Sequence, residues 1–191
     1  MCHQPSVHWM CQACQPASHQ VLYQPSEHIH ALVYLSAYDS ALGSLVRKSK
    51  ISGTRNTFVG LGLELARVVR REPVLQNIDG LVPVPSPWNR RLRRGFNPSA
   101  VMAHNCADTI QRPVFNPLRL KPGPRQATLS RTARAENFDT RLTSSGSVPR
   151  CIALIDDVYT TGATLDRCAS HLIGLGAFSI IGLVTCITKP N

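Results

Sequence analysis

The clearest pattern of apolar and polar positions lies near the end of the chain. Residues 151–155 are all apolar, which suits a buried strand, and the polar residues 156–164 that follow suit a turn. Residues 165–173 have the spacing of an amphipathic helix, and residues 178–186 are again largely apolar. Strand, turn, helix and strand in this order form a βαβ unit. We therefore expect an α/β domain with a largely parallel sheet flanked by helices.

The earlier part of the chain predicts further elements of the same kind. The expected strands cover residues 30–38, 81–84 and 114–118. The expected helices cover residues 41–52, residues 58–72 and a segment that begins at Asn97 and Pro98. In the last of these, a capping side chain precedes a proline that suits the first helical position.

Two stretches show no clear periodicity. The first ~20 residues are rich in Cys, His, Gln and Pro and contain no Asp, Glu, Lys or Arg, which is typical of a loop-rich knuckle. We divide the chain into a cysteine-rich segment, residues 1–30, and an α/β domain, residues 31–191. Residues 119–150 are polar, and long connections of this kind are often functional lids or disordered.

Composition narrows the class of protein and of partner. A length of 191 residues with 43% apolar residues supports one domain with a sizeable core, and seven cysteines do not make a disulfide miniprotein. The net charge is +10, and residues 47–150 hold 19 Lys or Arg against 6 Asp or Glu. This excess predicts an anionic partner, whether a phosphate ligand, a nucleic acid or a lipid headgroup.

No targeting or membrane segment is predicted. The N-terminus has no basic flank followed by an apolar run, so it does not resemble a signal peptide. The longest uncharged apolar stretch, residues 172–187, is shorter than the ~20 residues of a spanning helix and contains glycines. We expect a soluble cytoplasmic protein whose cysteines are reduced or bound to metal.

Candidate chemistry is concentrated in the turn at residues 156–164. Asp156 and Asp157 can accept hydrogen bonds from vicinal hydroxyls and hold a hydrated Mg²⁺, if the chain leaves strand geometry so that both face one ligand. The residues that open the next helix can surround a phosphate with hydroxyl and amide donors, and the glycine among them lets the main chain approach the ligand: Thr160, Thr161, Gly162, Ala163 and Thr164. The pattern favours a sugar-phosphate site over a plain strand end and helix cap.

At this point the chain resembles a known family. Ile152–Thr164, IALIDDVYTTGAT, resembles the phosphoribosyl pyrophosphate (PRPP) signature of type I phosphoribosyltransferases, with Tyr159 where an aliphatic residue is usual. The wider chain is similar to the ComF/GntX family from about residue 30 onward. That similarity rests on LVPVP at 81–85, RGFN at 94–97, Gln126 with Leu129, Arg134 with Asn137, and Tyr38 with the basic segment 48–50. It implies a type I phosphoribosyltransferase-like fold for residues 31–191.

The resemblance also implies roles for individual residues. Asp156 and Asp157 would be the catalytic acids that bind the ribose hydroxyls, and residues 160–164 would hold the 5′-phosphate. Residues 85–90, with Ser86 among them, stand in the place of the pyrophosphate loop. Residues 125–137 resemble the mobile loop that closes over PRPP.

An arginine cluster is the second candidate site, and its members are Arg90, Arg91, Arg93 and Arg94. Pyrophosphate that leaves an anomeric carbon develops charge that Mg²⁺ and arginine can stabilise, and no side-chain nucleophile is needed. We expect at least one of these arginines in the phosphate site. Arg131 and Arg134 would join on loop closure, and the alternative is that their segment is only a mobile surface loop. A solvated basic face and a grip on a nucleic-acid backbone are the alternatives.

The cysteines fall into two groups. Cys11 and Cys14 have zinc-knuckle spacing, and Cys2 lies upstream. Structural zinc sites require four ligands, so one ligand is missing from this set. Either the fourth is a cysteine before residue 1, or a histidine supplies it, or the site is lost; the candidates are His3, His8 and His19. The remaining cysteines lie in apolar patterns typical of core residues: Cys106, Cys151, Cys168 and Cys186.

Together these features predict a Mg²⁺-dependent, PRPP-binding phosphoribosyltransferase-like protein with an unknown acceptor and zinc as a second candidate cofactor. The resemblance implies DNA uptake or utilisation, DNA-processing partners and a homodimer. One alternative is a non-catalytic PRPP or nucleotide sensor or scaffold. Another is direct nucleic-acid binding through Arg90–Arg94, although aromatic residues are only 6% of the chain and are not interleaved with the arginines.

Overall fold

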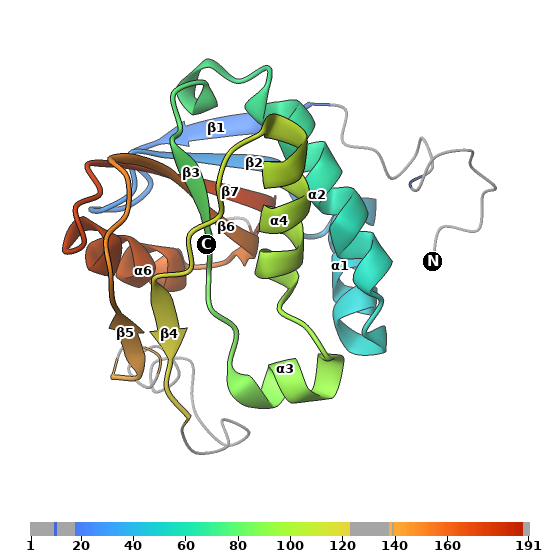
Figure 1. Cartoon of the computed structure of the whole chain (residues 1–191). Coiled ribbons are helices and arrows are strands. Elements are labelled where there is room, and N and C mark those ends of the chain that lie inside the picture. Colours follow the sequence, from blue (N-terminus) through green and yellow to red (C-terminus); the bar gives the residue numbers. More distant parts are fainter. Residues whose placement is uncertain (1–9, 11–17, 123–137, 139, 189–191) are drawn as a thin grey trace.

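The centre of the protein is a five-stranded sheet (Figure 1). The structure is a computed structural model that describes residues 10, 18–122, 138 and 140–188. The strand order is β1-β2-β7-β6-β3; β1 is antiparallel to its neighbour and the other pairs are parallel. The strands are β1 (Gln20–Tyr23), β2 (Ala31–Ala37), β3 (Gly80–Pro83), β6 (Cys151–Tyr159) and β7 (Ser179–Ile187). The predicted α/β class and the mostly parallel sheet are confirmed, and the arrangement is compatible with a phosphoribosyltransferase-like fold.

Helices cover both faces of this sheet. Figure 1 shows α1 (Ala41–Ser52), α2 (Arg55–Val69) and α4 (Pro98–Ile110) on one face and α6 (Ala163–Ile173) on the other. Successive strand residues point to opposite faces, so one strand serves two cores. Ile155 packs into the cluster beneath α1, α2 and α4, and Leu154 into the cluster beneath α6. Burial on both sides explains why β6 begins with an all-apolar run.

The helix ends follow the predicted capping chemistry. The Ser40 hydroxyl accepts a hydrogen bond from the Gly43 N–H, and Gly53 ends α1 at a φ of +70°. The Asn97 side chain accepts from the Ser99 N–H, with Pro98 in the first turn of α4. These local signals therefore position the two helices that later bring Lys50 and Ser99 to the site.

Other boundaries differ from the expectation. The helix expected at residues 58–72 begins at Arg55 and ends at Val69. In place of a strand at residues 114–118, β4 (Leu118–Leu120) pairs with β5 (Leu142–Ser144) in a separate antiparallel sheet. Part of the long polar connection is thus an ordered pair of strands, while residues 123–137 and 139 lie outside the described residues.

The N-terminal segment contributes to the main sheet. Strand β1 pairs with β2 at the edge of the sheet, in the register Gln20 with Tyr34 and Tyr23 with Ala31. Residues 1–9 and 11–17 lie outside the described residues. The division of the chain at residue 30 therefore stays a prediction.

Gly182 in the middle of β7 allows α6 to lie close to the sheet. A Cβ at this position would be 2.8 Å from Leu32 Cδ1 and 2.9 Å from Leu165 Cδ2. Leu32 comes from β2 and Leu165 from the first turns of α6, and both are fully buried in the same cluster. The two leucines occupy the space that a side chain would need.

Candidate functional site

A cavity of about 580 Å³ lies beyond the carboxyl ends of β2, β3 and β6. Its walls come from the segments that follow these strands, from the last turn of α1 and from α3 (Trp88–Arg94). Ligands in open α/β sheets bind at this edge, and the volume is that of a small-molecule site. The cavity is the candidate site.

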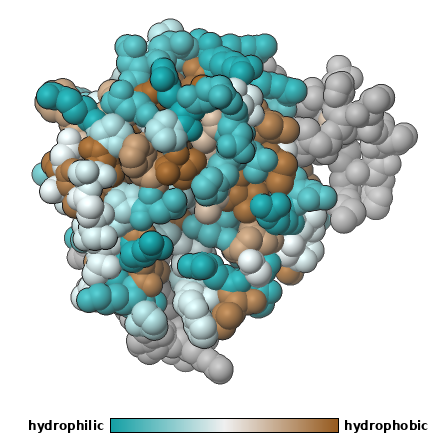
Figure 2. Space-filling view, in the orientation of Figure 1, coloured by the Kyte–Doolittle hydropathy of each residue, from teal (hydrophilic) through white to brown (hydrophobic). Residues whose placement is uncertain are grey.

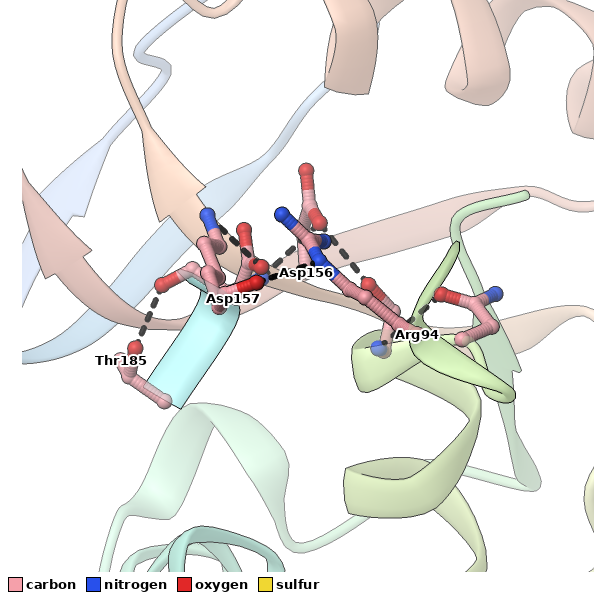
Figure 3. Close-up of polar contacts among 7 residues, drawn as sticks. Arg94, Asp156, Asp157 and Thr185 are labelled. Carbon is pink, nitrogen blue, oxygen red and sulfur yellow. Dashed lines mark hydrogen bonds and ion pairs between the residues drawn. The ribbon is translucent and has the colours of Figure 1, made fainter. Parts of the chain in front are cut away.

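The two acids both line this cavity. We expected β6 to end before Asp156, and this is wrong, because the strand continues to Tyr159. In the ladder between β6 and β7, Asp156 and Val158 each have a paired residue on β7, but Asp157 does not. The Asp157 N–H donates to Asp156 Oδ1 at 2.9 Å, and the Thr185 hydroxyl donates to the Asp157 carbonyl oxygen (Figure 3). The two acids thus line one cavity although they are adjacent residues of one strand.

Asp156 is held in a desolvated position. Its Oδ1 accepts hydrogen bonds from the Ser99 hydroxyl and from the Asp157 N–H, each at 2.9 Å. Burial, with a contribution from the charge of Asp157, raises the pKa of Asp156 to about 7, while Lys50 and the two hydrogen bonds oppose the shift. Asp156 therefore changes its protonation state near neutral pH.

Asp157 forms an ion pair with a lysine on α1. Lys50 Nζ lies 2.8 Å from Asp157 Oδ2, and the main-chain carbonyl of Lys50 accepts a hydrogen bond from Arg94 Nε at 2.8 Å. Burial lowers the pKa of Arg94, and the charge of Asp157 opposes that change. Lys50 thus connects the acid pair with the arginine-rich segment. Figure 3 labels Arg94, Asp156 and Asp157 within this group of polar contacts.

The start of α6 forms a second wall. Gly162 is the N-cap with a φ of +79°, and no side chain caps the helix, so its first N–H groups remain available to a ligand. Among the predicted phosphate residues, Thr160, Thr161, Ala163 and Thr164 line the cavity. Gly162 does not.

Gly162 has two structural reasons to be glycine. One is its positive φ, and the other is that a Cβ there would lie 2.3 Å from the Tyr159 hydroxyl oxygen. Tyr159 is buried with the α6 cluster. The close approach of the main chain to a ligand at Gly162 stays a prediction.

The arginine cluster is also different from the expected loop. Residues 88–94 form the helix α3, which has no buried residue. Arg90 and Arg94, four residues apart on one face, line the cavity together with Ser86, while Arg91 and Arg93 are exposed and do not. Arg134 lies outside the described residues.

Several cavity residues were not predicted as site residues. They are Tyr38, Lys50, Asn97, Ser99 and Arg167. Tyr38 and Lys50 belong to segments that resemble the family, so that resemblance was the available signal. Arg167 lies three residues after Thr164 on α6, and helical spacing indicates the same face. Ser99 carried no signal, because its contact with Asp156 joins residues far apart in the chain.

The structure describes only some of the predicted metal ligands. Cys2, Cys11 and Cys14 lie outside the described residues, as do His3 and His8. His19 Nε2 lies 2.8 Å from Glu72 Oε2. Over residues 18–122 and 140–188, no three His, Cys, Asp or Glu side chains are grouped as a metal would need. Zinc stays a prediction, and Mg²⁺ would take Asp156 and Asp157 plus ligand oxygens.

The remaining cysteines confirm most of the core assignment. Cys106, Cys168 and Cys186 are fully buried free thiols, and Cys151 is partly buried. Across the described part of the chain, none of the helices is both long and apolar enough to cross a lipid bilayer.

Comparison with known proteins gives three informative relatives. The chain is 36% identical over 110 residues to competence protein ComFC of Bacillus subtilis, covering 56% of this chain and 43% of that protein. It is 28% identical over 158 residues to competence protein F of Haemophilus influenzae, covering 78% and 69%. It is 30% identical over 196 aligned positions to the DNA utilization protein YhgH of Salmonella typhimurium, covering 94% and 84%. The match therefore spans less than half of ComFC but most of YhgH, and no protein-family model matches the chain.

Proposed function

The chain belongs to the ComF family, and we propose that it binds PRPP with Mg²⁺ in the cavity beyond β6 and acts in DNA uptake or utilisation. One observation carries the binding proposal. Two adjacent carboxylates, Asp156 and Asp157, line one cavity that also contains the uncapped start of α6 and two arginines of α3. A ligand with vicinal hydroxyls between two phosphoryl groups satisfies all three sets of partners.

In this proposal the sugar lies over the acid pair. Asp156 and Asp157 accept hydrogen bonds from the two ribose hydroxyls, and Lys50 pairs with Asp157. The 5′-phosphate lies at the start of α6, where N–H groups and the threonine hydroxyls donate to it and the helix dipole favours its charge.

The pyrophosphate lies on the opposite wall, against Ser86, Arg90 and Arg94. When the bond from the anomeric carbon to pyrophosphate breaks, the leaving oxygens gain charge that the two guanidinium groups stabilise. Bound Mg²⁺ would neutralise further charge on the same oxygens. An external acceptor supplies the electron pair of the new bond, so the protein needs no nucleophilic side chain.

The names of the relatives support the biological part of the proposal. Two are competence proteins and one is a DNA utilization protein. We place this chain in the same process, with PRPP as its small-molecule ligand. We do not propose an acceptor. If the protein transfers the phosphoribosyl group to none, it is a non-catalytic PRPP sensor.

Thermal unfolding with PRPP and MgCl₂ tests the binding proposal. A ligand at a hundred times its dissociation constant adds ~2.7 kcal/mol to the free energy of unfolding. For a chain of this size the melting midpoint should rise by roughly 5–10 °C. Asp156→Asn with Asp157→Asn should abolish the rise, and Asp108→Asn, an exposed carboxylate on α4, should retain it.

Wild-type protein whose midpoint does not move with millimolar PRPP and Mg²⁺ would exclude this function. Pyrophosphate release in a screen of nucleobases and amines then separates the two forms of the proposal. Release that depends on an acceptor indicates a transferase, whereas binding without release indicates a sensor.

A further inference from the structure

Helix α3 presents two different faces. Arg90 and Arg94 are four residues apart and both line the cavity. Trp88 and Leu92 are also four residues apart, and the helical repeat directs them to the opposite side of α3. Their exposed fractions are 57% and 62%. The same seven-residue helix therefore faces the ligand site with cations and faces solvent with large apolar groups.

The exposed side of α3 has the composition of a binding surface. Trp88 and Leu92 are flanked by the exposed side chains of Arg91 and Arg93. Tryptophan and arginine are the residue types that most often dominate binding energy at protein interfaces. In the space-filling view hydrophobic and hydrophilic residues adjoin at the lower part of the face, where α3 runs in Figure 1 (Figure 2).

Four exposed side chains of α3 make up this surface, namely Trp88, Arg91, Leu92 and Arg93, and we name them the α3 surface. The last turn of α1 lies next to the end of α3, because the Lys50 carbonyl accepts a hydrogen bond from Arg94.

The segments that form the α3 surface and the helix next to it carry no acidic residue. Residues 80–107 contain no Asp or Glu, and neither do residues 41–52 of α1. Residues 1–17 have no acidic residue, and residues 123–137 hold three arginines against one glutamate, so neither segment is an acidic partner for this surface. A second copy of the chain would bring the same basic surface, and two such surfaces repel each other.

We propose that the α3 surface binds an acidic peptide segment of another protein, in which bulky apolar side chains lie between carboxylates. The apolar side chains contact Trp88 and Leu92, and the carboxylates pair with Arg91 and Arg93. Single-stranded nucleic acid fits less well. Stacking platforms depend on several aromatic rings, and α3 offers one, Trp88, beside the aliphatic Leu92.

Fluorescence anisotropy with a labelled probe peptide tests the proposal. The probe holds four aspartates around two leucines; matched peptides replace the aspartates by asparagines or the leucines by serines. A labelled oligothymidylate of equal net charge is the nucleic-acid probe. We expect saturable binding of the aspartate–leucine peptide, at least fivefold weaker binding of each altered peptide, and weaker binding of the oligothymidylate.

Variants locate the binding on the protein. Leu92→Ser and Arg93→Gln should each weaken binding of the probe peptide at least fivefold. Ile173→Ser on α6 and Arg119→Gln on β4, which are exposed and lie on other elements, should not. Since α3 has no buried residue, these substitutions should leave the melting midpoint unchanged. Leu92 does not line the cavity, so the PRPP-induced rise in the midpoint should persist in Leu92→Ser, which separates this proposal from the proposed function.

Four outcomes would overturn the proposal. They are the absence of saturable peptide binding, equal losses in the two control variants, tighter binding of the oligothymidylate that Trp88→Ser but not Leu92→Ser abolishes, and a dimer in sedimentation that Leu92→Ser dissociates. The third would identify a nucleic-acid surface and the fourth an interface between two copies.

Discussion

Lys50 and Asp157 form an ion pair of 2.8 Å between the last turn of α1 and the strand that carries both site acids. The side chains of this pair are only 23% and 13% exposed, so the charge of Lys50 acts with little screening. Because the Lys50 charge also lowers the pKa of Asp156, one lysine influences both carboxylates.

We predict that Lys50→Met weakens binding of PRPP with Mg²⁺ about tenfold at pH 7. Without the ammonium group, the pKa of Asp156 rises further, so more of the pair carries a proton and fewer carboxylate charges remain for a cation. The pH profile of binding should move toward alkaline pH, and calorimetric titration across pH 6–9 measures this.

The controls separate charge from packing. Lys50→Arg retains a cation and should keep the original pH profile, and Lys48→Met removes an exposed lysine of the same helix without effect. A loss of affinity in Lys50→Met that is identical at every pH would contradict the electrostatic role.

Asp156→Asn should stabilise the ligand-free protein at pH 8. The pKa of Asp156 is raised from 3.8 to about 7, so between these values the folded state holds a proton that the unfolded state has lost. The stability that this group contributes is present below pH 4 and is lost as the pH rises through 7. The asparagine side chain has nearly the shape of aspartate but does not titrate, so its contribution to stability does not change with pH.

The expected gain at pH 8 is at least ~1 kcal/mol, or about 2–4 °C in the melting midpoint. At pH 4 the two proteins should melt together. Differential scanning calorimetry at both pH values is the measurement, and an equal difference at pH 4 and pH 8 would rule out titration of Asp156 as the cause.

Gly162→Ala should be more destabilising than Gly146→Ala. Both glycines have a positive φ, +79° and +84°, so both substitutions carry the same backbone strain. Only at Gly162 does the new Cβ meet another atom, the Tyr159 hydroxyl oxygen at 2.3 Å. The excess loss in the free energy of unfolding should be about 1–3 kcal/mol.

Urea unfolding of both variants measures this excess. Repeating the comparison in a Tyr159→Val background should remove it, because the aliphatic side chain leaves room for the Cβ. If the excess persists without the tyrosine, the contact is not its cause.

Arg90→Gln should weaken binding of pyrophosphate with Mg²⁺ about tenfold, whereas Arg91→Gln should change it less than twofold. Arg90 lines the cavity, whereas its neighbour Arg91 is exposed outside it. Both substitutions remove one positive charge, so they differ only in the position of that charge. Calorimetric titration with pyrophosphate at constant salt compares them. Equal losses would mean that only the general positive potential matters.

The elements that local chemistry specifies were predictable. The apolar run at residues 151–155 gave a buried strand, and Ser40 and Asn97 began the helices whose capping bonds the structure contains. The acid pair was identified for the same reason, since its residue types and its place after a buried strand indicate the chemistry.

What could not be predicted depends on contacts between distant segments. The arginine-rich segment was expected to be a loop, yet residues 88–94 form a helix whose last arginine bonds to the end of α1. The length of β6 is set by its ladder with β7, which resumes after the acids and reaches Tyr159. The partners of the acids, Lys50 and Ser99, lie on α1 and α4 and are seen only in the folded chain.

The missing side chain at Gly182 has a consequence for how variants of this protein should be interpreted. A methyl group there meets the ends of the Leu32 and Leu165 side chains, so these two leucines must change their packing between α6 and the sheet. Gly182→Ala would therefore disturb the seat of α6, although this residue does not line the cavity. Tolerance maps that count only the residues around the cavity would miss such a variant.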